Sequence, residues 1–339
     1  MPDESAGHIA VLGAGSWGTA LAYLLGGAWA DVRLWARDAA LVCRVESERS
    51  NTRYLPGVEL PPTVTATESL AAAVPGARAV FFAVPSSAVR QVGMASLQWV
   101  MPDTLIISAC KGLEERTDQR LTEVLHQVLG GKTSRIVALS GPNLAVEVAR
   151  GLPTAAVAAS NDSRDAAAVQ NLFAGVPTYR VYTGTDMLGV ELGGAIKNVI
   201  AIAAGVCDGL RLGDNSKAAL MTRGLTEAVR LGTALGARTE TFMGLSGVGD
   251  LIATGGSKLS RNYRVGYGLG EGQPLSSILA TLGQVAEGVP TTRAIHDLSH
   301  RAGVDMPLCN ALNAVLFEGR MTPAVIGELL LRPPRNEFD

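Results

Sequence analysis

Short apolar runs alternate with helical stretches over the first half of the chain. The apolar runs are bounded by turn residues, which is typical of strands buried on both faces, and they are His8–Gly13, Val32–Ala36, Ala79–Val84, Leu105–Ser108 and Ile136–Ser140. The helical stretches between them include Ser16–Gly26, Ser87–Leu97 and Asp118–Leu129. Strand and helix repeated in this way predict a parallel sheet with right-handed crossovers. Two further strand-like runs, Ala155–Ala159 and Thr178–Tyr182, flank a helix at Arg164–Phe173 and extend the predicted sheet.

The pattern changes after about residue 185, where helices follow one another without a convincing strand. The predicted helices are Met187–Cys207, Lys217–Leu235, Leu275–Leu282, Thr291–Ala302 and Pro307–Phe317. The fold class is therefore α/β, with an N-terminal Rossmann-type doubly wound parallel sheet and a C-terminal all-helical domain. We place the sheet domain at residues 1–186, the helical domain at 187–331 and a flexible tail at 332–339, which agrees with a length of 339 residues.

Composition excludes several classes of protein. Hydrophobic residues make up 47% of the chain and charged residues 18%, which suits a well-filled core and not a disordered chain. The 29 basic and 31 acidic residues give a net charge of −2, so there is no basic surplus to hold a phosphate polymer, and we expect no nucleic-acid partner.

Cysteine spacing and the chain's apolar segments indicate a soluble cytoplasmic protein. Cys43, Cys110, Cys207 and Cys309 lie far apart without a C-x-x-C pair, which suits buried thiols in a reducing compartment better than disulfides or a zinc site. The acidic start does not resemble a secretory signal. The apolar stretch Leu192–Cys207 is short and interrupted by Lys197 and Asn198, so no membrane insertion is expected.

A glycine-rich turn follows the first predicted strand. Gly13-Ala14-Gly15-Ser16-Trp17-Gly18 is a G-x-G-x-x-G sequence that opens a helix. The first glycine permits the tight turn, the second lets the backbone meet a pyrophosphate, and the third lets the helix pack on the strand. The free N–H groups and dipole of the helix start attract the anion. This context predicts a dinucleotide site rather than a purely structural turn.

The end of the second strand indicates which dinucleotide is bound. NAD-preferring sites usually place Asp or Glu there to hold the ribose hydroxyls, but this chain has Arg37. Arg37 could pair with a 2′-phosphate and stack on adenine, which favours NADP(H), with NAD(H) also possible. In the alternative reading Arg37 is solvated and Asp38 holds the ribose.

Lys197 and Asp250 are candidates for proton transfer. On a helix, Lys197 lies over Gly193 and Gly194, and we expect the missing side chains to leave room for a ligand beside the amine. The apolar residues that follow suggest a low-dielectric site, which favours the neutral amine needed by a proton acceptor. A lysine that reaches out to solvent is the alternative.

Three other sequence features are weaker evidence of function when each is taken alone. Ser260-Arg261-Asn262 follows a glycine-rich loop at a helix start and makes a credible phosphate site. Lys111 follows the strand Leu105–Ser108 at a sheet edge where ligands bind, although a surface lysine is common there. His296 and His300 are four apart on a predicted helix, but no third ligand accompanies them, so we interpret them as surface histidines and expect no metal.

Taken together, seven ordered motifs resemble the bacterial NAD(P)-dependent glycerol-3-phosphate dehydrogenases. They run from about Ile9 to Leu329 and are Gly13–Gly18, Cys110-Lys111-Gly112, Ser140-Gly141-Pro142, Glu191–Asn198, Gly244–Leu251, Ser260-Arg261-Asn262 and Val285-Ala286-Glu287-Gly288. The resemblance implies a 6-phosphogluconate-dehydrogenase-like arrangement of domains. It also implies reversible reduction of dihydroxyacetone phosphate to sn-glycerol 3-phosphate, which supplies phospholipid synthesis.

The resemblance also implies roles for individual residues. Lys197, Asp250 and Lys111 would be catalytic, with Lys197 the proton acceptor in alcohol oxidation. The cofactor would contact Gly13, Gly15, Ser16, Trp17, Gly18, Arg37, Lys111, Ala145, Arg261, Val285 and Glu287. The substrate would contact Lys111, Gly141, Asn143, Lys197, Asp250, Ser260, Arg261 and Asn262. This chain departs from the family at Asn143, where Ser or Thr is usual, and at Gly255-Gly256, which replace bulkier residues.

Two other functions remain open on the residues themselves. One is a dehydrogenase of the same layout that acts on a carboxylate such as a β-hydroxy acid. The other is a dinucleotide sensor without catalysis, which would not need Lys197 and Asp250 together. The apolar helices of the second domain could support a homodimer or be wholly internal.

Overall fold

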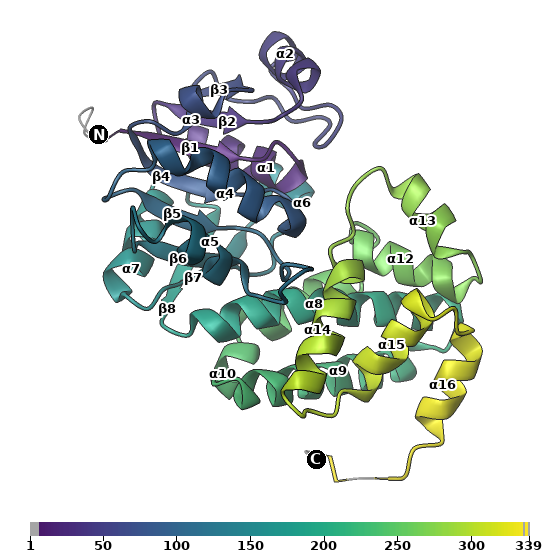
Figure 1. The fold of residues 1–339 in the computed structure, drawn as a ribbon. Helices are drawn as coiled ribbons and strands as arrows, with labels where there is room; N and C mark the ends of the chain where they lie inside the picture. The colour runs from purple at the N-terminus through teal and green to yellow at the C-terminus, as the bar shows by residue number, and fades with distance from the viewer. Residues whose placement is uncertain (1–6, 335, 338–339) are drawn as a thin grey trace. The chain divides into compact units, whose positions relative to one another are not determined.

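In a computed structural model of the chain, the predicted strands form one sheet of mixed direction (Figure 1). The order across the sheet is β3-β2-β1-β4-β5-β6-β7-β8. The strands are β1 (His8–Leu12), β2 (Val32–Trp35), β3 (Val64–Thr67), β4 (Ala77–Phe82), β5 (Leu105–Ser108), β6 (Ile136–Ser140), β7 (Thr154–Ala159) and β8 (Tyr179–Gly184). The strand order reverses between β1 and β4, the place where open α/β sheets bind ligands at their carboxyl ends.

The structure describes residues 7–334, 336 and 337, which divide into two units. The sheet unit runs to Cys110 and resumes over Arg120–Met187, and the helical unit comprises Lys111–Gln119 and the chain from Leu188 onward. The segment Lys111–Gln119 thus differs from the predicted boundary after residue 186. The reason is that Leu113, 1% exposed, belongs to the apolar core of the helical unit. Residues 335, 338 and 339 of the predicted flexible tail lie outside the described residues.

Alternate side chains of the central strands pack on opposite faces of the sheet. In β1, Ile9 and Val11 belong to the core shared with α1 (Ser16–Gly26) and α7 (Ser163–Leu172). Ala10 and Leu12 belong to the other core, beneath α4 (Val89–Ser96) and α5 (Leu121–Leu129). Helices therefore cover both faces, which explains why successive residues of these strands are mostly apolar.

Two features of the sheet were not predicted correctly. The antiparallel pairing of β7 with β6 departs from the predicted parallel sheet. The helix between them, α6 (Ala145–Ala149), has five residues and rises about 7 Å, whereas a strand of this length spans about 17 Å, so the helix cannot return the chain to the start of the sheet. The edge strand β3 was missed because it is short and follows Pro61 and Pro62.

Local contacts and backbone angles explain where several other helices of the sheet unit begin. α2 (Ala39–Glu48) begins after Asp38, whose side chain accepts the N–H of Leu41, and α3 (Leu70–Ala73) is capped by Ser69 in the same way. The predicted helix Asp118–Leu129 starts later than expected, at Leu121. Asp118 has a φ of 55°, which a right-handed helix cannot contain.

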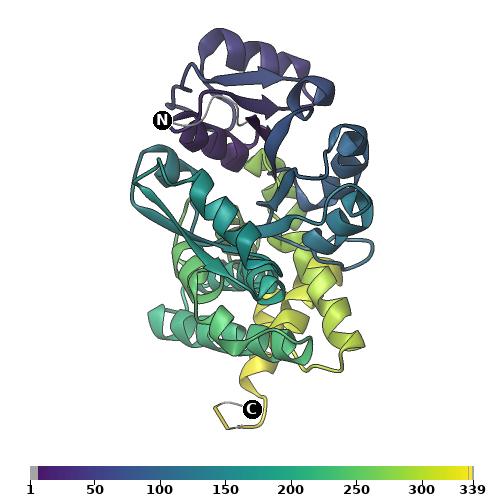
Figure 2. The same cartoon turned by 90° about the vertical axis from the view of Figure 1, so that its left-hand side faces the viewer.

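The helical unit contains no strand among its described residues (Figures 1 and 2). Its helices are α8 (Met187–Gly209), α9 (Asp214–Ala234), α10 (Thr239–Phe242), α11 (Asp250–Gly255), α12 (Arg261–Gly270), α13 (Leu275–Leu282), α14 (Gly288–Arg301), α15 (Pro307–Phe317) and α16 (Thr322–Leu330). α8 is long and apolar enough to cross a membrane, but it is buried almost throughout as the central helix of this unit.

Glycines allow α8 and α12 to touch backbone to backbone. A Cβ at Gly205 would lie 2.1 Å from the carbonyl oxygen of Tyr263, and a Cβ at Gly266 would lie 1.8 Å from that of Ile202. Neither distance is sterically possible, so any side chain here would push the two helices apart. This contact fixes Lys197 and its neighbour on α8 relative to the start of α12.

Candidate active site

The glycine turn after β1 has the geometry that a pyrophosphate site needs. Gly13 adopts a φ of +120°, which other residues rarely do, and a Cβ at Gly18 would lie 1.8 Å from the carbonyl oxygen of Gly13. A Cβ at Gly15 would meet no atom within 4 Å, so the backbone is open to a ligand there. Ser16 begins α1, and its hydroxyl donates to the carbonyl of Tyr54 at 2.6 Å.

Charged side chains gather where β2 ends. Arg37 is exposed, and none of the described residues forms an ion pair with it. Asp38 caps α2, because its Oδ1 accepts the N–H of Leu41 at 3.1 Å. Its Oδ2 lies 3.4 Å from Nη1 of Arg53. Asp38 is thus engaged in capping a helix and in an ion pair.

The loop after β6 carries three of the predicted residues. Gly141 has a φ of +136°, and a Cβ there would lie 2.9 Å from Cα of Ala156, so a larger residue does not fit. Both polar atoms of the Asn143 amide are buried without a hydrogen-bond partner. Ala145 begins α6, which packs against α1. An unpartnered buried amide is costly, and it is the kind of group that a ligand satisfies.

Two lysines share one buried carboxylate in the helical unit. Asp250, the first residue of α11, is 2% exposed; its Oδ2 accepts Nζ of Lys111 at 2.6 Å and its Oδ1 lies 2.9 Å from Nζ of Lys197. Lys197, on α8, also donates to Oγ1 of Thr254 at 2.8 Å, and that hydroxyl donates to Oδ1 of Asp250 at 3.1 Å. The two residues named as candidates for proton transfer are therefore in direct contact.

Burial sets the protonation of this centre. Burial of the Lys197 ammonium lowers its pKa to about 8, although the charge of Asp250 acts in the opposite direction and that of Lys111 reinforces the decrease. Burial also penalises the Asp250 carboxylate, but Lys111 and Lys197 outweigh it and hold the pKa of that carboxyl below its usual value. A lysine amine that exchanges a proton near neutral pH therefore lies beside a carboxylate that stays ionised.

The expected free space over Gly193 is absent. A Cβ at Gly193 would lie 3.2 Å from the carbonyl oxygen of Ser246, in the π-helical turn Leu245–Gly249 (η3) that leads into Asp250. The prediction that this missing side chain leaves room for a ligand is wrong. The glycine instead admits the turn, which brings Asp250 to Lys197.

In the triplet at the start of α12, Ser260 and Asn262 are buried and Arg261 is partly buried. Ser260 caps the helix by accepting the N–H of Tyr263 at 3.2 Å. The Asn262 amide donates to Oδ1 of Asn198 at 2.8 Å and accepts the N–H of Gly288 at 2.9 Å. Burial lowers the pKa of the Arg261 guanidinium, and the charge of Glu287 opposes the decrease, so these two predicted residues influence each other.

Sequence reasoning assigned no role to Thr254 or Asn198. Thr254 lies one helical turn after Asp250 on α11, so its spacing was a usable signal. Asn198 directly follows Lys197 but contacts a residue 64 positions away, which no local pattern reveals.

Val285, His296 and His300 were also singled out in the sequence. Val285 is 47% exposed. The rings of His296 and His300 pack against each other, tilted by 53° with their centroids 4.2 Å apart. No group of three or more His, Cys, Asp or Glu side chains suited to a metal occurs in the described part of the chain.

Cys207 and Cys309 are buried as expected, but Cys43 is exposed on α2, so the prediction of buried thiols is wrong there.

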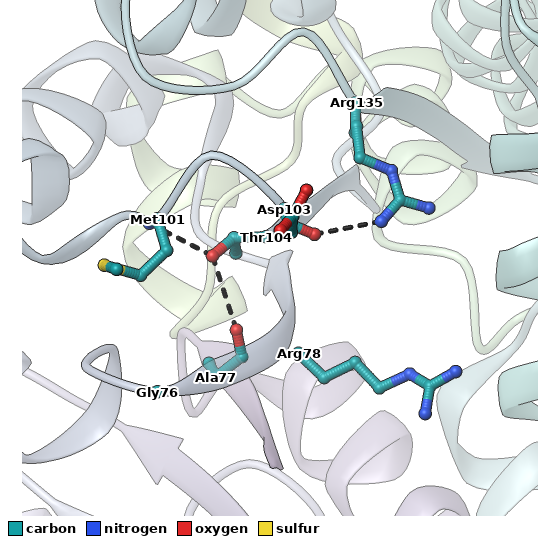
Figure 3. Close-up of a pocket in the computed structure, with 7 residues that line it drawn as sticks. All are labelled: Gly76, Ala77, Arg78, Met101, Asp103, Thr104 and Arg135. Carbon is teal, nitrogen blue, oxygen red and sulfur yellow. Dashed lines mark hydrogen bonds between the residues drawn. The ribbon is translucent and has the colours of Figure 1, made fainter. Parts of the chain in front are cut away.

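A shallow pocket at the amino edge of the sheet contains none of the predicted residues. It has a volume of about 430 Å³ and is lined in part by Arg78, Arg135 and Met101 (Figure 3). Arg135 forms an ion pair with Asp165 at 2.7 Å and donates to the carbonyl of Asp103 at 2.9 Å. The side chain of Asp103 adds a second negative charge, so the charges balance and indicate no class of ligand.

Comparison with protein families finds one match for each half of the chain. Residues 8–166 match the family described as NAD-dependent glycerol-3-phosphate dehydrogenase N-terminus, and residues 186–326 match the corresponding C-terminus family.

Individual proteins and a solved structure match over nearly the full length. The chain is 49% identical to "Glycerol-3-phosphate dehydrogenase [NAD(P)+]" of Koribacter versatilis, over 97% of this chain and 98% of that one. It is 47% identical to the protein of the same name from Moorella thermoacetica, over 98% of each. The crystal structure of glycerol-3-phosphate dehydrogenase from Coxiella burnetii aligns with a TM-score of 0.92 at 40% identity, covering 96% of this chain and 99% of that one.

Proposed function

The chain belongs to the NAD-dependent glycerol-3-phosphate dehydrogenase family, and from that premise we propose that it reduces dihydroxyacetone phosphate reversibly to sn-glycerol 3-phosphate. The observation that carries the proposal is the buried Lys197–Asp250 pair, with Lys111 on the second oxygen of the same carboxylate. A surface lysine or a non-catalytic sensor has no need of a buried amine whose pKa lies near 8.

Lys197 is the acid in reduction and the base in oxidation. As the ketone is reduced, the ammonium protonates the developing alkoxide, and its charge stabilises that oxygen before the proton moves. In the reverse direction the neutral amine accepts the hydroxyl proton. Asp250 and Thr254 hold Nζ in place, since each contacts it within 2.9 Å.

Arg261 holds the phosphate of the substrate, with Ser260 and Asn262 beside it. A guanidinium forms two parallel hydrogen bonds to a phosphate, and partial burial strengthens them. The backbone contact between α8 and α12 fixes the start of α12, where Arg261 lies, relative to Lys197, and the charge of Arg261 contributes to lowering the pKa of Lys197. Lys111, Gly141 and Asn143 complete the set assigned to the substrate.

The sheet unit holds the cofactor, NADP(H) in preference to NAD(H). When bound, the dinucleotide supplies or accepts the hydride. The open backbone at Gly15 and the start of α1 suit a pyrophosphate, with Ser16 and Trp17 beside it. Arg37 suits a 2′-phosphate, because both oxygens of the Asp38 carboxylate, the usual partner of the ribose hydroxyls, are engaged: Oδ1 caps α2 and Oδ2 pairs with Arg53. Ala145, Arg261, Val285 and Glu287 are further cofactor contacts in this proposal.

The proposal includes the enzyme's cellular location and its oligomeric state. The enzyme would act in the cytoplasm and supply phospholipid synthesis. A homodimer would cover the apolar side chains of Met321, Leu330 and Leu331, which are 73%, 80% and 84% exposed at the ends of α16. Size-exclusion chromatography with light scattering tests the dimer.

One assay tests the reaction. Purified protein with NADPH and dihydroxyacetone phosphate should consume NADPH, and a panel of 3-keto acids should give rates lower by at least about a hundredfold, because they lack the phosphate. Equal or faster turnover of a keto acid would assign the chain to another substrate. Binding of NADPH without turnover of any of these compounds would indicate a sensor.

A further inference from the structure

A second arginine lies at the carboxyl end of β2, where Arg37 and Asp38 already gather. Nη1 of Arg53 is 3.4 Å from Oδ2 of Asp38, although the two residues are 15 positions apart. The guanidinium also lies over the ring of Tyr54, 5.0 Å from its centroid. These two contacts hold a long and half-exposed side chain in one place.

The segment that carries Arg53 is tied to the glycine turn. The amide of the buried Asn51 donates to the carbonyl of Ala14 at 2.9 Å and to Oγ1 of Thr19 at 2.8 Å. The hydroxyl of Ser16 donates to the carbonyl of Tyr54 at 2.6 Å. The position of Arg53 is therefore set by the same turn that would receive the dinucleotide.

The local charges matter because a 2′-phosphate is nearly dianionic at neutral pH. Arg37 attracts such a group, but an unshielded Asp38 carboxylate directly after it would repel it. Arg53 reduces that repulsion by pairing with Asp38 and adds a second positive charge. The N–H groups at the start of α2 help further, since one of them already binds Asp38 Oδ1 at 3.1 Å.

We infer that Arg53 determines cofactor specificity: it neutralises Asp38 and joins Arg37 in binding the 2′-phosphate of NADP(H). The inference rests on the proposed dinucleotide site of the sheet unit and adds a residue to it. Without Arg53, no positive charge offsets the Asp38 carboxylate, and its Oδ2 can accept hydrogen bonds from the ribose hydroxyls of NAD(H).

Binding measurements without substrate test this inference. Dissociation constants of NADPH and NADH are measured for the full chain by titration calorimetry, at low and moderate salt. In R53A we expect NADPH to bind about tenfold more weakly and NADH to bind equally or more tightly. The salt dependence of NADPH binding should also weaken, because one phosphate contact is lost. R44A removes an equal charge from the exposed face of α2 and should leave both constants unchanged.

A double variant tests whether Arg53 acts through Asp38. Asn caps helices as well as Asp does, so D38N keeps α2 intact while it removes the carboxylate. D38N/R53A should therefore recover part of the NADPH affinity lost in R53A. Equal weakening of NADPH and NADH in R53A, or no change in either, would overturn the inference while the proposed reaction could still stand. If wild-type protein bound neither dinucleotide, the proposed function itself would fail.

Discussion

Nζ of Lys197 lies 2.9 Å from Oδ1 of Asp250 in a place where both side chains are less than a tenth exposed. Two opposing effects act on this pair: burial favours the neutral amine, and the carboxylate favours the ammonium. Burial prevails, so the pKa of Lys197 is about 8. An ordinary lysine would be almost fully protonated at neutral pH and could not act as a base there.

This balance predicts opposite pH profiles for the two directions of the reaction. Reduction needs the ammonium, so its kcat should fall as the pH rises through about 8; oxidation needs the amine, so its kcat should fall as the pH drops through the same value. Steady-state kinetics between about pH 6 and 10, with both substrates saturating, measure this. Profiles that rise and fall together would show that Lys197 is not the group that titrates.

Replacing Lys197 with Met should abolish turnover and leave cofactor binding nearly intact. A positioned acid contributes a factor of about 10² to 10⁴, and its charge on the developing alkoxide adds to this. The side chain of Met is similar in length, so the buried space stays filled. NADPH affinity and kcat are measured on the same sample, with K132M on the exposed surface of the sheet unit as a control. Loss of NADPH affinity along with turnover would contradict the assigned role.

Much of the sheet unit could be predicted from sequence because its causes are local. The apolar run of β1, the glycine turn and α1 are adjacent, and each depends on its own residues. The direction of β7 could not be obtained in this way. It depends on the length of α6 relative to the strand, which the apolar pattern does not encode.

In the candidate site, too, the features with local causes could be predicted, and the contacts between distant segments could not. Lys197 and Asp250 stood out through their motifs, but the contact between them spans 53 positions. The role of Gly193 was misjudged because a gap on a helix surface can be filled by any other segment of the chain. Here the backbone at Ser246 fills it, and a single sequence carries no sign of that packing.

Replacing Arg261 with Lys should raise the KM for dihydroxyacetone phosphate about tenfold and change kcat little. Lysine keeps the charge but lacks the planar fork that makes two hydrogen bonds to a phosphate, and one charge-assisted bond is worth about 1.5 kcal/mol or more. The exposed Arg264 on the same helix supplies the matched control, R264K. An unchanged KM in R261K would remove Arg261 from the phosphate site.

A second buried acid, Glu227 on α9, predicts a pH-dependent stability unrelated to catalysis. Its carboxyl oxygens accept the N–H groups of Leu308 at 2.7 Å and Cys309 at 3.2 Å, at the start of α15. Burial raises the pKa of Glu227 from 4.5 to about 7, even though these two hydrogen bonds favour the ionised form.

Because the folded chain holds this proton more tightly than the unfolded chain, its contribution to stability is complete below about pH 4.5 and is lost as the pH rises to about 7. The free energy of unfolding should therefore fall by about 3 kcal/mol from this residue alone over that range. E227Q has no such proton. The unfolding free energy of wild type minus that of E227Q should therefore fall by that amount between pH 4.5 and 7.5. Urea unfolding at several pH values measures it, with E240Q on the exposed surface as the control. Wild-type and E227Q curves that stayed parallel across this range would show that Glu227 is ionised in the folded protein throughout.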